Sequence, residues 1–330
     1  MSSNQFYGTI KPKAEFNAEL AADSLEKAMK GFGCDKNKLI QVLTHINNAQ
    51  RQMIRTPYKT KYGKDLVREL KRECSGDFED VMVGLMETPT KYDVLQLNKA
   101  VKGLGTKEKI LIEILCSRTN EELAAIRNEY QNEYGKTLEH DVIGDTSGAL
   151  QRLLVSLVQG RRDESQYVDD LKANQDAHKL LADGEKKLGT DDSTFNSILV
   201  TQNFNQLKKV FVEYEKITGH GFEKAIEKEF SGDTKKGFLA IVQCIESKPK
   251  YFAKQLYDSM KVVSILRMVF TGLGTRDNDL IRVIISRSEI DLALIREEFE
   301  VMYKKPLIDF IKSDCSGAYR DSLISIVKGN

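Results

Sequence analysis

The sequence predicts an all-α protein built from four homologous repeats of about 70 residues, each consisting of five short helices. Two observations lead to this prediction. A glycine loop and an acidic string recur four times at one fixed separation, and the segments between them have the apolar spacing of amphipathic helices. The chain shows no sustained alternation of apolar and polar residues, which is the pattern of a half-buried strand.

The repeats are recognised by two short strings. The glycine loop reads KGFGC at 30–34, KGLGT at 102–106, KKLGT at 186–190 and TGLGT at 271–275. The acidic string reads ECSG at 73–76, DTSG at 145–148, EFSG at 229–232 and DCSG at 314–317. In every copy the acid follows the second glycine of the loop by 40 residues. An interval that is held four times indicates a repeated structural unit.

The copies divide the chain in order. We expect an N-terminal tail at 1–18, the first repeat at 19–88, the second at 89–160, a linker at 161–175, the third repeat at 176–247 and the fourth at 248–330. The linker is polar and charged, and it separates two halves of two repeats each.

Helical spacing is clear inside the repeats. In KEKILIEILC (107–116), four apolar residues, Ile110, Leu111, Ile114 and Leu115, fall on one helix face. At the loops we expect glycine to end one helix and Thr or Asp to cap the next. The serine of each acidic string is placed to cap the helix that follows it.

The fourth copy contains an addition. Its run VVSILRMVF precedes GLGT, and alone it fits either a buried strand before a phosphate-binding turn or a helix end directed at a membrane. Comparison with LEKAMKG (25–31) and LNKAVKG (97–103) indicates about ten extra residues, 262–271. Helical continuation would add about 15 Å and turn the loop by roughly 80°. The alternative is a bulge, which would enter a membrane interface or repack the fourth repeat.

The repeated acid indicates a cation. A carboxylate at a helix C-terminus faces the negative end of the helix dipole, which is unfavourable without a positive partner. Glycines allow backbone carbonyls to turn outward and converge. Carbonyls plus one carboxylate form an all-oxygen shell, which suits Ca²⁺ better than Mg²⁺, and no His or Cys recurs in phase to favour zinc or copper. Open coordination positions would accept phosphate, so we expect calcium-mediated binding of an anionic surface.

At this point the residues resemble a known family. The four loops, the acid 40 residues later and SRSEIDLALIREEF (286–299) are similar to the annexins over about residues 15–330. The resemblance implies a curved disc of four five-helix repeats with calcium loops on the convex face. It also implies a cytoplasmic protein that attaches peripherally to acidic phospholipids such as phosphatidylserine when calcium rises. Self-association on membranes stays open.

The resemblance also assigns a ligand set to each copy. By position, the predicted Ca²⁺ ligands are Met29, Gly31, Gly33 and Glu73 in copy one, Val101, Gly103, Gly105 and Asp145 in copy two, Gly184, Lys187, Gly189 and Glu229 in copy three, and Phe270, Gly272, Gly274 and Asp314 in copy four. All are backbone carbonyls except the four acids. Copy one departs from the pattern because Cys34 replaces the usual Thr, which leaves Asp35 to cap the next helix. His45 and Gln202 stand where the other copies have Arg118 and Arg287.

Composition limits the alternatives. Lys plus Arg is 50 and Asp plus Glu is 49, so no charge imbalance indicates a nucleic-acid partner. The N-terminus MSSNQFYGTIKPK lacks the apolar core of a signal peptide, and five scattered cysteines without a CxxC pair favour free thiols in a reducing compartment. GxGxxG, GxxxxGK[ST], HExxH and GxSxG are absent, so we expect no enzyme. The main alternative is a helical-repeat scaffold that binds protein partners and whose loops are plain turns.

Overall fold

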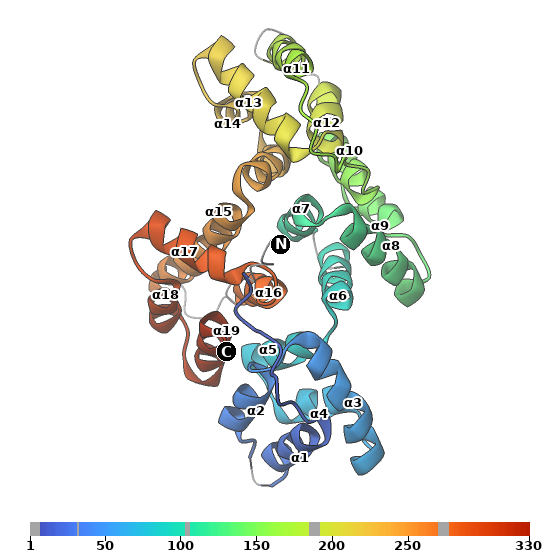
Figure 1. Ribbon diagram of the computed structural model, residues 1–330, viewed down its shortest axis with the longest axis vertical. Coiled ribbons are helices and arrows are strands. Elements are labelled where there is room, and N and C mark those ends of the chain that lie inside the picture. Colours follow the sequence, from blue (N-terminus) through green and yellow to red (C-terminus); the bar gives the residue numbers. More distant parts are fainter. Residues whose placement is uncertain (1–6, 32, 103–105, 185–191, 270–276) are drawn as a thin grey trace. The chain divides into compact units, whose positions relative to one another are not determined.

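In a computed structural model, the described parts of the chain are residues 7–31, 33–102, 106–184, 192–269 and 277–330, with the backbone alone described for 261–269. Every regular element in these parts is a helix (Figure 1). The helices are α1 (Ala18–Met29), α2 (Lys36–Leu43), α3 (Asn48–Tyr62), α4 (Leu66–Glu73), α5 (Gly76–Met86), α6 (Pro89–Val101), α7 (Glu108–Ser117), α8 (Asn120–Tyr134), α9 (Leu138–Asp145), α10 (Gly148–Val158), α11 (Asp170–Asp183), α12 (Asp192–Thr201), α13 (Phe204–Thr218), α14 (Phe222–Glu229), α15 (Gly232–Val269), α16 (Asp277–Arg287), α17 (Leu292–Tyr303), α18 (Leu307–Asp314) and α19 (Gly317–Lys328).

Each copy contributes five helices, as the sequence predicts. The long α15 contains two of them, because Ser247 interrupts it with φ −159° and ψ 103°. The part before Ser247 is the fifth helix of copy three, and the part after it is the first helix of copy four. The predicted all-α fold of four repeats is confirmed.

Local sequence signals fix the third helix of each copy. In copies one and two, α3 and α8 begin with capping boxes, formed by Asn47 with Gln50 and by Thr119 with Glu122. The helices α3, α8 and α13 each end at a glycine with positive φ, a backbone conformation that residues with a Cβ disfavour. These C-caps are Gly63 at φ 67°, Gly135 at 69° and Gly219 at 75°. In copy four Lys304 takes the same backbone conformation, with φ 57°.

The chain folds into two compact units. Unit 1 consists of Met1–Tyr92 and Pro249–Asn330, and unit 2 consists of Asp93–Lys248. The first and fourth repeats therefore share one unit, and the second and third share the other. The expectation that the linker separates two halves of the fold is wrong. The linker lies inside unit 2, where Asp163 N–H donates to the Thr201 carbonyl at 2.7 Å.

Unit 1 is built around α5, against which α16 and α19 pack (Figure 1). A Cβ on Gly84 in α5 would lie 2.7 Å from Ile285 Cδ1, so α5 and α16 approach closely at this glycine. An ion pair between the buried Arg51 and the half-buried Glu289, at 2.5 Å, also joins the first and fourth repeats. The two repeats share one core because apolar and charged side chains from both fill it.

The predicted N-terminal tail is fixed to unit 1 from Tyr7 onward. The backbone N–H groups of Thr9 and Ile10 donate to the Ser288 carbonyl at 2.7 and 3.1 Å, and the Ile10 side chain is fully buried. The Asn330 side-chain amide donates to the Lys11 carbonyl at 3.1 Å. Lys13 N–H donates to Gln50 Oε1 at 2.9 Å, so the segment joins the first and fourth repeats.

Unit 2 packs α10 against α7 and α12. A Cβ on Gly237 would lie 2.8 Å from Leu153 Cδ2, so the fifth helix of copy three approaches α10 closely. Lys248, the last residue of unit 2, donates from Nζ to the Ser117 carbonyl at 2.8 Å, which joins the end of the unit to the end of α7.

The added segment of copy four is helical where it is described. Residues 262–269 continue α15 to Val269, so their backbone follows the helical alternative. Residues 270 and 271, and the loop after them, lie outside the described residues. Within the described chain, no helix combines the length and apolarity that crossing a membrane requires.

Candidate calcium sites

The predicted acids occupy one structural position in all four copies. Glu73, Asp145, Glu229 and Asp314 are each the last residue of an eight-residue helix, namely α4, α9, α14 and α18. After each acid the chain turns through a glycine with φ near 60°, a conformation that favours glycine. These are Gly76 at 60°, Gly148 at 61°, Gly232 at 58° and Gly317 at 60°. The turn fixes the carboxylate at a helix C-terminus, where a cation is favoured.

The serines of the acidic strings do not cap as we expect from the sequence. Ser75, Ser147 and Ser316 stand at the N-cap positions of α5, α10 and α19, but no side-chain cap hydrogen bond forms. Their backbone is extended, and the following glycine makes the turn. The glycine rather than the serine hydroxyl therefore defines this corner.

In copy one the glycine loop has the backbone that convergent carbonyls need. Gly31 has φ 125° and Gly33 has φ 94°, and a Cβ on either would meet no atom within 4 Å. Glycine is required here for conformation and not for space. Met29 is the last residue of α1, so its carbonyl is one of the last four of the helix, which accept no hydrogen bond from within the helix. The loop returns to this turn through a 2.8 Å bond from Asp35 N–H to the Ala28 carbonyl.

The same loop lies against its predicted acid. The negative charge of Glu73 acts on the Cys34 thiol, so the residue after the loop lies near the acid. Burial, with this neighbour, raises the pKa of Cys34, and burial raises the pKa of Cys74 to about 12. Glu73 accepts from Arg72 Nε at 3.0 Å. As predicted, Asp35 caps α2, accepting from Lys38 N–H at 3.0 Å.

Copy two repeats this arrangement. Lys107 N–H donates to the Ala100 carbonyl at 3.0 Å, which matches the bond that folds the loop of copy one. Thr106 Oγ1 donates to the Asp145 carbonyl at 2.9 Å, so the loop residue reaches the end of α9. The expectation that this threonine caps the next helix is wrong, because the N-cap of α7 is Lys107. Val101 ends α6, and Gly103 and Gly105 lie outside the described residues.

Copies three and four are described only in part. Gly184 is the C-cap of α11, and a Cβ on it would lie 2.9 Å from the Leu180 carbonyl oxygen and 3.0 Å from Phe195 Cζ. Asp314 is 9% exposed, whereas Asp145 is exposed. The other predicted ligands of these copies, Lys187, Gly189, Phe270, Gly272 and Gly274, lie outside the described residues.

The residues present fit a calcium ion. Each copy places one carboxylate at a helix end, and in copy two Thr106, the residue after the loop glycines, reaches that end. Carboxylate and carbonyl oxygens are the hard ligands that Ca²⁺ takes in flexible geometry. Within the described residues, no group of three or more His, Cys, Asp and Glu side chains is placed to hold a metal. The predicted sites do not need one, because each uses a single side chain.

The positions of the Ser-Arg motif form polar pairs, which are buried in copy two and part-buried in copy three. In copy two, Arg118 donates two hydrogen bonds to Asp93, at 2.6 and 2.8 Å, and both side chains are buried. In copy three Gln202 Nε2 donates to Asp176 at 2.8 Å, so an amide takes the place of the guanidinium. Sequence reasoning identified the Arg position but missed its acidic partner. In copies two and three this partner comes from the first helix of the repeat, whereas in copy four Arg287 donates to Asp291 at 2.7 and 2.8 Å.

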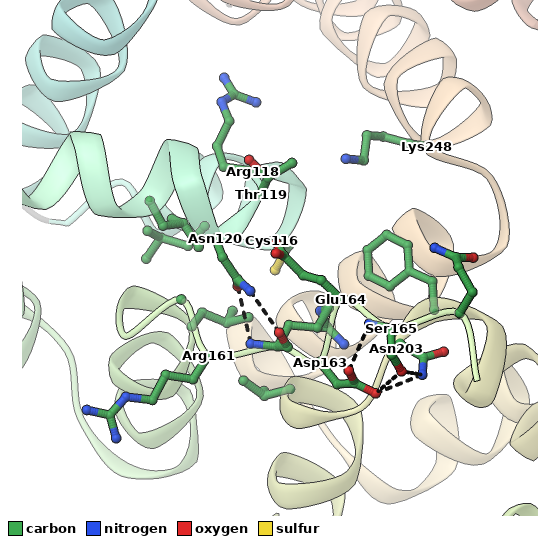
Figure 2. Close-up of a pocket in the computed structure, with 18 residues that line it drawn as sticks. Cys116, Arg118, Thr119, Asn120, Arg161, Asp163, Glu164, Ser165, Asn203 and Lys248 are labelled. Atoms are coloured by element: carbon green, nitrogen blue, oxygen red, sulfur yellow. Dashed lines mark hydrogen bonds between the residues drawn. The ribbon is translucent and has the colours of Figure 1, made fainter. Parts of the chain in front are cut away.

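Unit 2 also contains a pocket of about 300 Å³ beside the linker (Figure 2). Figure 2 shows Asp163, Ser165 and Asn203 bonded to one another, with Asn203 Nδ2 donating to Asp163 at 2.8 Å. Asn120 and the Arg162 backbone exchange two hydrogen bonds. Burial raises the pKa of Cys116, whose thiol donates to the Gly237 carbonyl at 3.9 Å. These groups hold the linker in place, and Cys116 remains a protonated thiol.

A family model described as Annexin matches residues 20–85, 92–157, 175–241 and 251–326. The chain belongs to the annexin family. Human annexin A4 is 49% identical to it over 323 residues, covering 98% of each chain. A structure of chicken annexin V is 45% identical, with a TM-score of 0.90, and the match covers 98% of this chain and 99% of that one. A calcium-bound structure of annexin (Sm)1 is 31% identical, with a TM-score of 0.82 and coverage of 98% and 93%.

Proposed function

We propose that this annexin binds acidic phospholipid membranes when calcium is present, without catalysis. Membership of the family supports calcium-dependent phospholipid binding in general. Calcium bound at a loop would supply positive charge and open coordination positions to a lipid phosphate. The ligands we propose are the sixteen residues predicted from the sequence, of which the four acids supply the only side-chain oxygens.

One observation carries the proposal. In all four copies an acid ends an eight-residue helix before a glycine turn. A plain turn gives no reason to keep a carboxylate at the negative end of a helix dipole, whereas a cation site does. Copy one strengthens this reasoning because its loop glycines adopt positive φ values that residues with a side chain rarely take.

The cellular setting is a further part of the proposal. We infer a cytoplasmic protein that attaches peripherally to phosphatidylserine-containing membranes when calcium rises. Exposed lysines next to the loops, such as Lys30 and Lys102, would add attraction to an anionic surface of about 1 kcal/mol each. Calcium and lipid should each tighten the binding of the other by the same factor.

Co-sedimentation with vesicles tests the proposal. The protein should pellet with vesicles of phosphatidylserine and phosphatidylcholine in millimolar calcium, and remain in the supernatant with chelator or with phosphatidylcholine alone. The variant Glu73→Gln, Asp145→Asn, Glu229→Gln, Asp314→Asn should lose the calcium-dependent fraction. Equal pelleting with calcium and with chelator would favour a protein-binding scaffold instead.

A matched control separates site chemistry from net charge. Four exposed acids outside the glycine loops and acidic strings can be neutralised in the same way: Glu19→Gln, Asp80→Asn, Glu121→Gln and Glu164→Gln. Both quadruple variants gain the same charge, so both increase general attraction to an anionic surface equally. Only the helix-end variant should lose the response to calcium. If both variants keep it, our assignment of ligands is wrong.

A further inference from the structure

The pocket beside the linker of unit 2 contains an arginine with no carboxylate partner among the described residues. Arg162 lines this pocket and is half-buried. Its Nη1 donates to the Gln202 carbonyl at 2.7 Å, and its Cζ lies 5.0 Å from the centre of the Phe204 ring, which also lines the pocket. A guanidinium has five N–H donors, so one hydrogen bond to the protein leaves most of this capacity unused.

Buried arginines elsewhere in the chain are paired with acids. Arg51, Arg118 and Arg287 each lie beside a carboxylate, at 2.5, 2.6 and 2.7 Å. Burial lowers the pKa of Arg162 to about 10, so the side chain still carries its charge at neutral pH. A charge that is partly removed from water and has no counterion is unfavourable, and an anion from solution would stabilise it.

The acid next to Arg162 in the sequence is bound elsewhere. Asp163 accepts from the Ser165 N–H and hydroxyl at 2.8 and 2.9 Å and from Asn203 Nδ2 at 2.8 Å (Figure 2). The Arg162 backbone is also held, because the Asn120 side-chain amide exchanges two hydrogen bonds with it, at 2.7 and 3.2 Å. The linker therefore fixes the base of the Arg162 side chain without neutralising its charge.

The rest of the lining indicates what kind of anion fits. The apolar side chains of the pocket are Leu115, Leu123, Leu157, Val200 and Phe204. A ligand would therefore need an apolar body as well as a charge. The pocket volume of about 300 Å³ is at the lower end of the range for small-molecule sites.

The charge of the ligand can be limited in the same way. Asp163 and Glu164 also line the pocket, and they would repel a doubly charged phosphate more strongly than a singly charged group. A carboxylate carries one charge, and its two oxygens match the planar fork of a guanidinium.

We propose that this pocket binds a small amphiphilic monocarboxylate, whose carboxylate pairs with Arg162 and whose apolar chain lies against Leu115, Leu123 and Leu157. The site goes beyond the proposed function, because none of the residues that line it is a proposed calcium ligand. It can therefore be tested without calcium and without a membrane.

Calorimetric titration of the full chain with octanoate, in the presence of chelator, tests the site. Octanoate should bind at least about tenfold more tightly than octanol, which has the same chain without the charge. Acetate, which has the charge without the chain, should also bind more weakly, and inorganic phosphate should not displace octanoate. Equal affinity for octanoate and octanol would overturn the role of the charge. Displacement by phosphate would overturn the assignment of a monocarboxylate, and no binding of octanoate would refute the site.

Two variants with the same loss of charge separate Arg162 from general attraction. Arg162→Gln keeps an amide that can donate to the Gln202 carbonyl, and it should weaken octanoate binding about tenfold or more while octanol binding is unchanged. Arg161→Gln is the control, because Arg161 is exposed and Figure 2 shows its side chain pointing away from Asp163, Ser165 and Asn203. This control should bind octanoate as the unaltered protein does.

The same variants show what would contradict the proposal. An equal loss of octanoate binding in both variants would mean that the attraction is general. Loss of octanol binding together with octanoate binding in Arg162→Gln would mean that Arg162 only maintains the shape of the pocket. Amide hydrogen exchange gives the location: octanoate should slow exchange in residues 160–166, and protection confined to other parts of the chain would refute the site. None of these measurements depends on membrane binding, so the proposed function can fail while this site stands.

Discussion

Substitution of a loop glycine tests how the first site is built. Gly33 has φ 94°, and a Cβ there would meet no atom within 4 Å, so Gly33→Ala introduces backbone strain and no clash. Holding a side-chain-bearing residue in such a conformation costs about 1 to 3 kcal/mol. This strain must appear in one of two measurements, and the structure allows us to say how they are related.

If the loop of the variant keeps its conformation, the strain lowers the free energy of unfolding by about 1 to 3 kcal/mol, and calcium affinity is unchanged. If the loop relaxes, stability is preserved and the calcium affinity of the first site falls by up to about 5- to 150-fold. If the loop relaxes in part, the strain energy is divided between a lower free energy of unfolding and a weaker binding free energy for calcium. The sum of both losses should therefore stay near the strain energy.

Urea unfolding without calcium measures the first quantity. Calorimetric calcium titration measures the second, in a background in which Asp145→Asn, Glu229→Gln and Asp314→Asn leave one site. Gly144→Ala is the control, because Gly144 lies inside α9 with free space around it; alanine there should stabilise the helix by about 0.5 to 1 kcal/mol. A Gly33→Ala variant with unchanged stability and unchanged calcium affinity would refute this reasoning.

Three other substitutions test the surrounding structure. Asp93→Asn leaves the buried Arg118 without its anion and should lower the free energy of unfolding by about 3 to 5 kcal/mol in urea; a loss below 1 kcal/mol would contradict the buried pair. The Tyr58 hydroxyl bonds Glu26 at 2.6 Å and lowers the pKa of that carboxyl below 4.5. The lowered pKa stabilises the folded state at pH values above the pKa of Glu26 in the unfolded chain, and this stabilisation is lost as the pH falls through the pKa of Glu26 in the folded chain. Tyr58→Phe should therefore weaken the dependence of the free energy of unfolding on pH in this acidic range. An unchanged dependence would rule the interaction out. Thr106→Val removes the hydroxyl that reaches the end of α9 and should cost about 0.5 to 1.5 kcal/mol by thermal unfolding, with weaker calcium binding in copy two; wild-type values for both would contradict that role.

The sequence was sufficient to predict the architecture because the four repeats can be compared with one another within the same chain. A fixed interval of 40 residues from Gly33 to Glu73, repeated in three other copies, predicted four helical units whose acids share one position. The structure confirms that architecture and places each acid at the end of a short helix. Local patterns are enough for such features, because helix ends depend on neighbouring residues.

Long-range partners were not predictable in the same way. The bond from Arg118 to Asp93 joins residues 25 apart, and the ion pair of Arg51 with Glu289 joins residues 238 apart. Neither interval repeats along the chain, so no pattern indicates the pairing. The grouping of the first repeat with the fourth was missed for the same reason: the linker suggested a division by sequence order, whereas burial follows the faces that pack together.

The helix caps were mispredicted because the preference of Ser and Thr for N-cap positions does not tell which backbone group their hydroxyls will bond. Threonine is a residue type that favours helix N-caps, but the Thr106 hydroxyl donates its hydrogen bond to the Asp145 carbonyl. Ser75 stands at the right position, but the glycine after it already makes the turn. Serine and threonine hydroxyls bind whichever backbone group the tertiary fold presents, so these errors arose where two segments meet.

The glycine turn after each acid has a consequence for how the four copies differ. Gly76, Gly148, Gly232 and Gly317 adopt nearly the same φ, so the corner that carries each acid has nearly the same backbone in every copy. The copies differ more in the sequences of their glycine loops, which read KGFGC, KGLGT, KKLGT and TGLGT. Differences in affinity among the copies should therefore be transferable by exchanging loops alone. A chain with four graded loops would respond to calcium over a wider concentration range than four identical sites.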